Sequence, residues 1–299
     1  MKRILCAAIA VLLFTGLFAC RTEPAVEAFS AATAAPAAPT AASASEPAAE
    51  PTAEPTAEPA PETEEPEPAA EPMPAPTPEP VTRERLDSGE FDAFFDGAVF
   101  VGDSMTREFG NYVRKQRELN GECLSTAQFM GMVSMTVRFA STTEPVFNYR
   151  GGKVSLTTGL NHYGAKKVFL MLGANDIGHR DWDKVRADYC TMIERIRTDC
   201  PEAGIIVQGI NPGTRMFCKN RDLDIAQWNS FNEVLKGIAE EYGLGYYAFA
   251  EELMDEEGYL RPEFASGDLH LSASGNEIWL RAARAYAAQQ MCPGAAIEP

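Results

Sequence analysis

The sequence predicts an α/β domain built on a parallel sheet with helices on both faces. Short apolar runs that are typical of buried strands recur along residues 83–299. Segments whose apolar residues repeat every three to four positions, as in amphipathic helices, lie between them. Because parallel strands need crossover connections, this alternation favours a central parallel sheet over an antiparallel one.

The expected strands are short and rich in Val, Ile, Phe, Leu and Tyr, which suit a pleated, buried surface. We expect them at 98–101, 168–172, 204–208 and 245–249, with a fifth around 124–130. The helices are predicted from apolar positions that share one face, such as Val185, Tyr189 and Ile193. They are expected over 185–197, 225–242 and 274–290, the last with Ser274 and Glu277 as a capping box.

Residues 1–20 have the layout of an export signal. Lys2 and Arg3 precede an apolar run that is shorter than a membrane-spanning helix. The run ends in Leu-Phe-Ala-Cys, which resembles a bacterial lipobox and predicts acylation of Cys20; the alternative is an ordinary secretory signal with a chance cysteine. We therefore expect a protein that is anchored by lipid to the cell membrane and faces the extracytoplasmic side.

Residues 21–82 have the composition of a spacer. Fifteen of the 21 prolines lie between residues 21 and 80, together with twelve glutamates and one arginine. Proline and mutually repelling charges disfavour a packed core, so this segment is predicted to be a disordered linker before a domain at 83–299. The whole chain has a net charge of −17, which argues against nucleic acid as a partner.

Three polar residues of types that can take part in catalysis follow apolar runs or precede the last helix. Ser104 ends Gly-Asp-Ser after the first run, Asn175 lies in Gly-Ala-Asn-Asp after the second, and His270 lies in Asp-Leu-His near the C-terminus. In parallel sheets, ligands bind beyond the carboxyl ends of the strands, so these residues are expected to meet. Each alone is also typical of a turn or a helix cap.

The three residue types fit acyl transfer through a serine. A serine hydroxyl becomes a nucleophile when a base such as histidine removes its proton. The negative oxygen that forms needs preorganised donors, which a serine N–H, a glycine N–H and an asparagine amide can supply. Serine, asparagine and histidine in this order therefore predict an esterase-type site.

On these residues the domain resembles the SGNH hydrolases, also called GDSL-type esterases. Val101-Gly102-Asp103-Ser104 is similar to the family's nucleophile block, and Gly173-Ala174-Asn175-Asp176 is similar to its G-x-N-D block. The resemblance implies a flavodoxin-like three-layer α/β/α sandwich with Ser104 as nucleophile and His270 as base. It also implies an oxyanion hole made by Ser104, Gly131 and Asn175.

One position departs from the family pattern. The family places an aspartate three residues before the histidine, where this chain has Gly267, and Asp268 lies only two before. Asp268 is expected as the third triad member; the alternatives are a backbone carbonyl in its place or an inactive domain.

The function expected is hydrolysis of short-chain, acetyl-type esters on carbohydrate or cell-wall polymer. Acyl transfer to a wall sugar by the same serine and a non-catalytic glycan-binding module are the alternatives. An ester substrate, such as an acetylated glycan, and the membrane, through Cys20, are the expected partners. No Cys or His cluster has metal-ligand spacing, so neither metal nor cofactor is expected.

Overall fold

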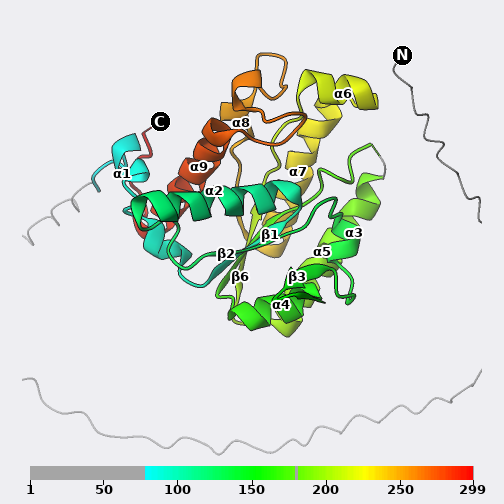
Figure 1. The fold of residues 1–299 in the computed structure, drawn as a ribbon, viewed down its shortest axis with the longest axis horizontal. Coiled ribbons are helices and arrows are strands. Elements are labelled where there is room, and N and C mark those ends of the chain that lie inside the picture. Colours follow the sequence, from blue (N-terminus) through cyan, green and yellow to red (C-terminus); the bar gives the residue numbers. More distant parts are fainter. Residues whose placement is uncertain (1–77, 179–180, 299) are drawn as a thin grey trace, which may run out of the picture. The chain divides into compact units, whose positions relative to one another are not determined.

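A five-stranded parallel sheet forms the centre of the domain (Figure 1). The structure, a computed structural model, describes residues 78–178 and 181–298. The strand order in this sheet is β2-β1-β5-β6-β7, and each neighbouring pair is parallel. The strands are β1 (Ala98–Gly102), β2 (Gln128–Gly131), β5 (Lys167–Met171), β6 (Gly204–Gln208) and β7 (Gly245–Tyr247). The predicted parallel α/β sheet is confirmed.

The strands form where the apolar runs were found, with two shifts. Strand β2 occupies only the end of the expected 124–130 segment, because Leu124 and Ser125 have φ values of 51° and 45°. This left-handed backbone is incompatible with a strand, so the chain turns there before it pairs with β1. Strand β7 stops at Tyr247, because Phe249 adopts the conformation that precedes the short helix α8 (Ala250–Leu253).

Three of the long helices lie where the amphipathic patterns predicted them. Helix α7 (Ile225–Tyr242) matches its expected range, and α5 (Trp182–Asp199) begins three residues early because Asp181 caps it. Helix α9 (Ala273–Met291) is capped by Ser272, whose Oγ accepts the Gly275 N–H at 3.3 Å. The predicted cap at Ser274 is wrong: its hydroxyl instead donates to the Glu263 carbonyl.

Several shorter elements were not expected from the sequence, and neither was the long helix that follows β1. That helix is α2 (Ser104–Asn120). The short helices and the separate hairpin are α1 (Arg83–Asp87), η1 (Asp92–Phe95), α3 (Val137–Ala140), β3 (Phe147–Tyr149), β4 (Gly152–Val154), α4 (Leu156–Tyr163), α6 (Arg215–Arg221) and η2 (Pro262–Phe264).

Aromatic stacking joins the sheet to helices α2 and α9. Phe100 of β1 stacks on Phe169 of β5 with ring centroids 4.5 Å apart. Phe109 of α2 stacks on Trp279 of α9 at 4.2 Å, and both side chains are fully buried. Offset stacking of buried rings adds to the area that they remove from water. The stacking of Phe109 on Trp279 fixes α2 relative to α9. This matters because both helices begin at the site described below.

The folded unit begins before the predicted boundary at residue 83. Val81 is fully buried and bridges Ile297, with its N–H donated to the Ala296 carbonyl at 2.8 Å. The predicted export signal, Cys20 and nearly all of the predicted linker lie outside the described residues. Among the residues that are described, no helix is both long and apolar enough to cross a membrane.

Candidate active site

The nucleophile candidate lies at the junction of β1 and α2. Asp103 is the cap of α2: its Oδ1 accepts the Met105 N–H at 2.9 Å, and the backbone carbonyl accepts the Arg107 N–H. Ser104 is therefore the first residue of the helix, at the carboxyl end of a central strand. The Ser104 N–H belongs to the first turn, where helices leave donors without an intrahelical partner. It is thus available to a negatively charged oxygen of a substrate.

The structure brings Ser104 and His270 together across 166 residues of sequence. His270 Nε2 and Ser104 Oγ are 2.8 Å apart. In the tautomer that carries its proton on Nδ1, the ring accepts a hydrogen bond from the serine hydroxyl and can remove that proton. Ser104 is 9% exposed, and the His270 side chain is 33% exposed. The His270 ring is therefore partly open to solvent, whereas Ser104 is largely buried.

The loop that carries His270 is held through its backbone. The His270 carbonyl accepts the Ser266 N–H at 2.7 Å, and the Leu269 carbonyl accepts a hydrogen bond from Asn211 Nδ2 at 2.8 Å. Asn211 is fully buried and follows β6, so the loop is anchored to the central sheet. The backbone that carries His270 is thus anchored, although the loop has little regular structure.

Asp268 does not contact the ring in the way the family resemblance implies. Asp268 is exposed, and its backbone carbonyl accepts the Thr214 N–H at 3.0 Å. Among the described residues, no hydrogen bond or ion pair joins the Asp268 carboxylate to His270. Nor does any described residue make a hydrogen bond to His270 Nδ1. The assignment of Asp268 as third triad member stays a prediction without geometric support.

Gly131 lies directly against the first turn of α2. It ends β2 opposite Gly102, and the N–H of the next residue, Met132, donates to the Gly102 carbonyl. Because alternate residues of a parallel strand bond the same neighbour, the Gly131 N–H is not used by β1. A Cβ at this position would be 2.2 Å from the Arg107 nitrogen, so no larger residue fits. The predicted role of Gly131 in the oxyanion hole stays a prediction.

Asn175 lies beside the nucleophile turn and is already hydrogen-bonded there. Its Nδ2 donates to Asp103 Oδ2 and to the Met135 carbonyl, both at 3.1 Å. These bonds hold the amide against Asp103, the residue before Ser104. The amide therefore lies near the place where the predicted oxyanion hole requires it. A substrate oxyanion would have to share one of the two amide protons. The contact between Asn175 and an oxyanion therefore stays a prediction as well.

The Asp103 carboxyl is buried and its pKa is strongly raised. Burial, which penalises the charged form, raises the pKa of Asp103 to about 7, although the Met105 N–H opposes the shift. The negative charges of Asp176 and Glu108 raise it further. Asp103 therefore orients both the start of α2 and the Asn175 amide. Its two carboxyl oxygens accept hydrogen bonds from the Met105 N–H and from Asn175 Nδ2.

The turn after β5 is shaped by a glycine and an aspartate. Gly173 has a φ of +126°, and a Cβ there would be 2.1 Å from a ring carbon of Phe231. Only glycine meets both conditions. The fully buried Asp176 accepts the Val137 N–H at the start of α3 through Oδ2, at 2.9 Å. Asp176 thus fastens the Asn175 turn to the segment that follows β2.

One charged residue at this site was not anticipated from the sequence. Glu108, four residues after Ser104 on α2, has its Oε1 3.9 Å from His270 Nε2. A residue four positions after a helix-starting nucleophile lies on the same helix face. The four-residue spacing of Ser104 and Glu108 could be seen in the sequence. The position of His270 relative to Glu108 could not.

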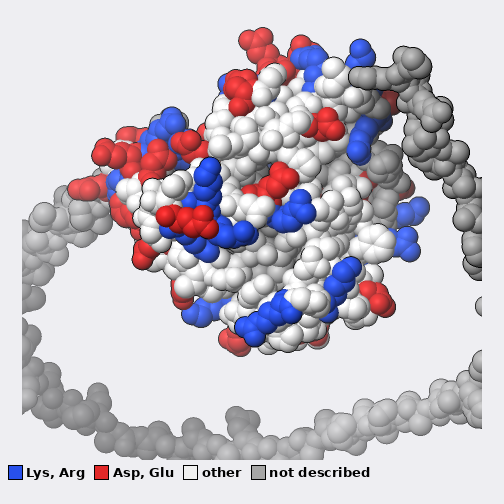
Figure 2. All heavy atoms as spheres, viewed as in Figure 1, with Lys and Arg blue, Asp and Glu red and all other residues white. Residues whose placement is uncertain are grey.

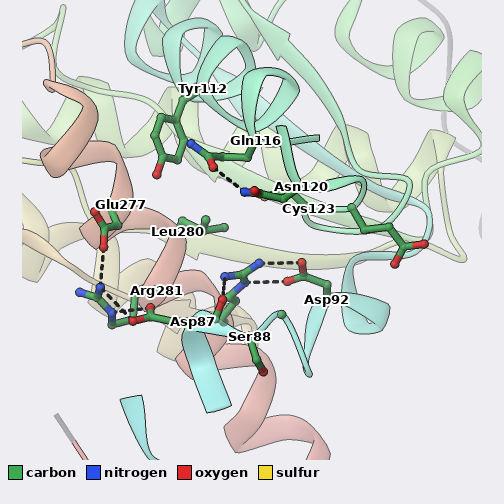
Figure 3. Close-up of a pocket in the computed structure, with 13 residues that line it drawn as sticks. Asp87, Ser88, Asp92, Tyr112, Gln116, Asn120, Cys123, Glu277, Leu280 and Arg281 are labelled. Atoms are coloured by element: carbon green, nitrogen blue, oxygen red, sulfur yellow. Dashed lines mark hydrogen bonds and ion pairs between the residues drawn. The ribbon is translucent and has the colours of Figure 1, made fainter. Parts of the chain in front are cut away.

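A separate polar cavity of about 530 Å³ lies between the N-terminal segment, α2 and α9 (Figure 3). Its guanidinium groups are paired: Arg284 with Asp92 at 2.7 and 2.8 Å, and Arg281 with Asp87 and Glu277. Tyr112 of α2 and Leu280 of α9 also line it. These paired charges join the N-terminal segment to α9.

Figure 2 shows how the charged side chains are distributed on one face of the domain. Basic and acidic side chains are interspersed there among large uncharged areas, and no continuous basic surface forms. No group of three or more His, Cys, Asp or Glu residues that could hold a metal ion occurs in the described part of the chain. Its five cysteines are free thiols.

A serine paired with a histidine at the carboxyl edge of a parallel sheet, within helices on both faces, defines the class of serine ester hydrolases with a three-layer α/β fold. The family model described as "GDSL-like Lipase/Acylhydrolase family" matches residues 100–278. The chain belongs to this family. No curated protein sequence gives a significant match.

Similar solved structures come from several bacteria. A GDSL-like lipase from Bacteroides thetaiotaomicron is 15% identical over 64% of this chain and 88% of its own, with a TM-score of 0.50. A lipase/acylhydrolase from Enterococcus faecalis is 17% identical, with coverages of 65% and 95% and a TM-score of 0.46. A carbohydrate acetylesterase family member from Sinorhizobium meliloti is 15% identical, with coverages of 65% and 98% and a TM-score of 0.47. The likeness to the Bacteroides structure confirms the predicted three-layer fold.

Proposed function

We propose that this serine ester hydrolase acts outside the cytoplasm on short-chain, acetyl-type esters of carbohydrate or cell-wall polymer, through an acyl-serine intermediate. The observation that carries the chemistry is the 2.8 Å separation of Ser104 Oγ and His270 Nε2. At this distance the ring can take the hydroxyl proton as the oxygen attacks.

The proposed reaction has two halves. In the first, Ser104 Oγ bonds to the ester carbonyl carbon while its proton passes to His270 Nε2. The Ser104 N–H, the Gly131 N–H and the Asn175 amide are the proposed donors to the resulting oxyanion. The intermediate then collapses, the ester C–O bond breaks, and His270 returns the proton to the leaving alcohol.

In the second half, His270 takes a proton from water, and the hydroxide oxygen bonds to the acyl carbon. The bond to Ser104 Oγ breaks, the serine regains its proton from the ring, and the free acid departs. No cofactor enters this sequence, because bond making and proton transfer balance between substrate, water and the two side chains.

The proposed location and substrate are supported by the sequence layout. An export signal that ends at Cys20, followed by a proline-rich spacer, favours a domain tethered to the membrane within reach of envelope polymers. O-acetylated sugars are esters that such polymers carry. Two acyl chains on Cys20 would make the tether stable, whereas a single chain binds a membrane only marginally.

The proposed function is tested with the full chain in detergent micelles. We expect acetate release from 4-nitrophenyl acetate and from an acetylated oligosaccharide by the wild type. Activity should fall by at least a thousandfold in Ser104→Ala and in His270→Ala. A fluorophosphonate probe should label the wild type and not Ser104→Ala. A wild type that is labelled but releases no acetate, unless a sugar acceptor is added, would indicate an acyltransferase instead.

A further inference from the structure

Glu108 is a charged side chain that lies close to the Ser104–His270 pair and was not part of the predicted site. Its Oε1 is 3.9 Å from His270 Nε2, the same nitrogen that contacts Ser104 Oγ at 2.8 Å. Both the Glu108 and the His270 side chains are one third exposed, so the pair is partly shielded from water. A carboxylate at this distance attracts a positively charged ring more strongly than it would in bulk solvent.

The helix geometry holds Glu108 in this place. Side chains four residues apart share one helix face, and the Cα–Cβ bond is tilted toward the helix N-terminus. Glu108 therefore reaches back over the turn that carries Ser104. The neighbouring residue, Phe109, stacks on Trp279 of α9 at 4.2 Å, which fixes the rotation of α2 about its axis.

The reaction needs a negative charge beside His270. When the ring takes the serine proton it becomes an imidazolium, and enzymes of this type stabilise that cation with a carboxylate. Asp268, which the resemblance assigns to this task, is exposed, and no hydrogen bond joins it to His270 within the described residues. A carboxylate on another element that lies close to the ring can supply this charge.

The other acidic group near the nucleophile is engaged elsewhere. Asp103 is buried, and its two carboxyl oxygens accept hydrogen bonds from the Met105 N–H and the Asn175 amide. Its pKa is raised to about 7 by burial and, among smaller causes, by the charge of Glu108. That charge is therefore felt within the catalytic turn.

We propose that Glu108 is a positioning residue whose charge stabilises the protonated form of His270 during acyl transfer, acting from the Nε2 side of the ring and not from the Nδ1 side that the third member of a triad would contact. This inference rests on the proposed esterase function. Glu108 exchanges no proton and forms no bond with the substrate: its carboxylate lowers the energy of the ion pair that exists while the ring carries the serine proton. The contribution appears in the transition state and not in substrate binding.

The test compares four variants of the full chain in detergent micelles with 4-nitrophenyl acetate, a neutral substrate without sugar contacts. Glu108→Gln keeps the shape and removes the charge, and Glu108→Asp keeps the charge on a shorter side chain. Asp268→Asn tests the competing carboxylate, and Glu118→Gln is the matched control on an exposed position of the same helix.

We expect Glu108→Gln to lower kcat about tenfold while KM stays within about twofold. Glu108→Asp should recover part of the loss, to within about threefold of wild-type kcat, because its carboxylate is retained. Asp268→Asn should lose less kcat than Glu108→Gln, and Glu118→Gln should stay within about twofold of wild type. Thermal unfolding should show the same midpoint for Glu108→Gln and wild type, which separates the charge effect from misfolding.

Three results would overturn the inference. These are a kcat for Glu108→Gln within twofold of wild type, a loss in Asp268→Asn that equals or exceeds that in Glu108→Gln, and equal losses in Glu108→Gln and Glu108→Asp. Fluorophosphonate labelling separates the two levels of the proposal. A wild type that is not labelled at Ser104 refutes the esterase function itself, whereas equal labelling rates for wild type and Glu108→Gln refute only the role of Glu108.

Discussion

Asp103 should make the stability of the domain depend on pH in an unusual direction. Its side chain is 1% exposed, and burial raises the pKa of this carboxyl from its ordinary value of 3.8 to about 7. An unfolded chain has no such burial, so its aspartate keeps the ordinary value. Between these two pKa values the folded state binds more protons than the unfolded state.

The sign follows from this difference in bound protons. Where the folded state holds the extra proton, the free energy of unfolding decreases as the pH rises. The destabilisation is absent below about pH 4, grows through the interval and is complete above about pH 7. Each pH unit of difference corresponds to about 1.4 kcal/mol, so the whole interval is worth roughly 4 kcal/mol. Four carboxyls whose pKa values are lowered in the folded state act in the opposite direction: Glu90, Asp96, Asp255 and Glu257.

The measurement is urea unfolding of the wild type and Asp103→Asn at pH 4, 5.5 and 8. We expect the difference in unfolding free energy, wild type minus variant, to fall by roughly 4 kcal/mol from pH 4 to pH 8. The asparagine places an amide against Asn175 Nδ2, which lowers stability equally at every pH. Asp181→Asn is the matched control, because Asp181 also caps a helix but is exposed. A constant difference between wild type and Asp103→Asn across the three pH values would refute the reasoning.

Three further substitutions test the packing that supports the site. Gly131→Ala should abolish at least 90% of esterase activity, because its Cβ would be 2.2 Å from the Arg107 nitrogen and would displace the first turn of α2; activity and circular dichroism check this. Arg284→Ala should destabilise the domain by about 3–5 kcal/mol in urea unfolding, since it leaves the Asp92 carboxylate buried without its partner. Trp279→Ala should cost about 3–5 kcal/mol and loosen the contact between α2 and α9, so kcat should fall along with the unfolding midpoint.

The sheet and the nucleophile turn could be predicted because their signals are local. Buried parallel strands are short apolar runs, and each central one keeps its run intact in the structure. The place of Ser104 was also predictable, because parallel strands bring their carboxyl ends to one edge of the sheet. The place of His270 was expected from the family resemblance, since its loop follows no strand of the sheet directly. Neither prediction required knowledge of side-chain packing.

The features that were missed depend on distant contacts or on backbone angles. Glu108 lies beside His270 only because a loop 162 residues later in the chain packs next to α2. The hairpin of β3 and β4 turns through Arg150 and Gly151, whose φ values are 45° and 82°. An arginine in left-handed backbone is rare, so its sequence gave no hairpin signal of the usual Asn-Gly kind. For Asp268 the family pattern is shifted by one residue, and its assignment as third triad member stays a prediction.

The pairing of Val81 with the C-terminal segment has a mechanical consequence. Val81 exchanges two backbone hydrogen bonds with that segment, from its own N–H to Ala296 and from the Glu298 N–H to its carbonyl. A force that pulls on the chain before residue 78 is therefore borne first by these bonds, and then by the Arg281–Asp87 and Arg284–Asp92 ion pairs. The load passes into the far end of α9, away from His270 at its start. Tension on a tether would thus reach the folded domain without being transmitted directly to the catalytic pair.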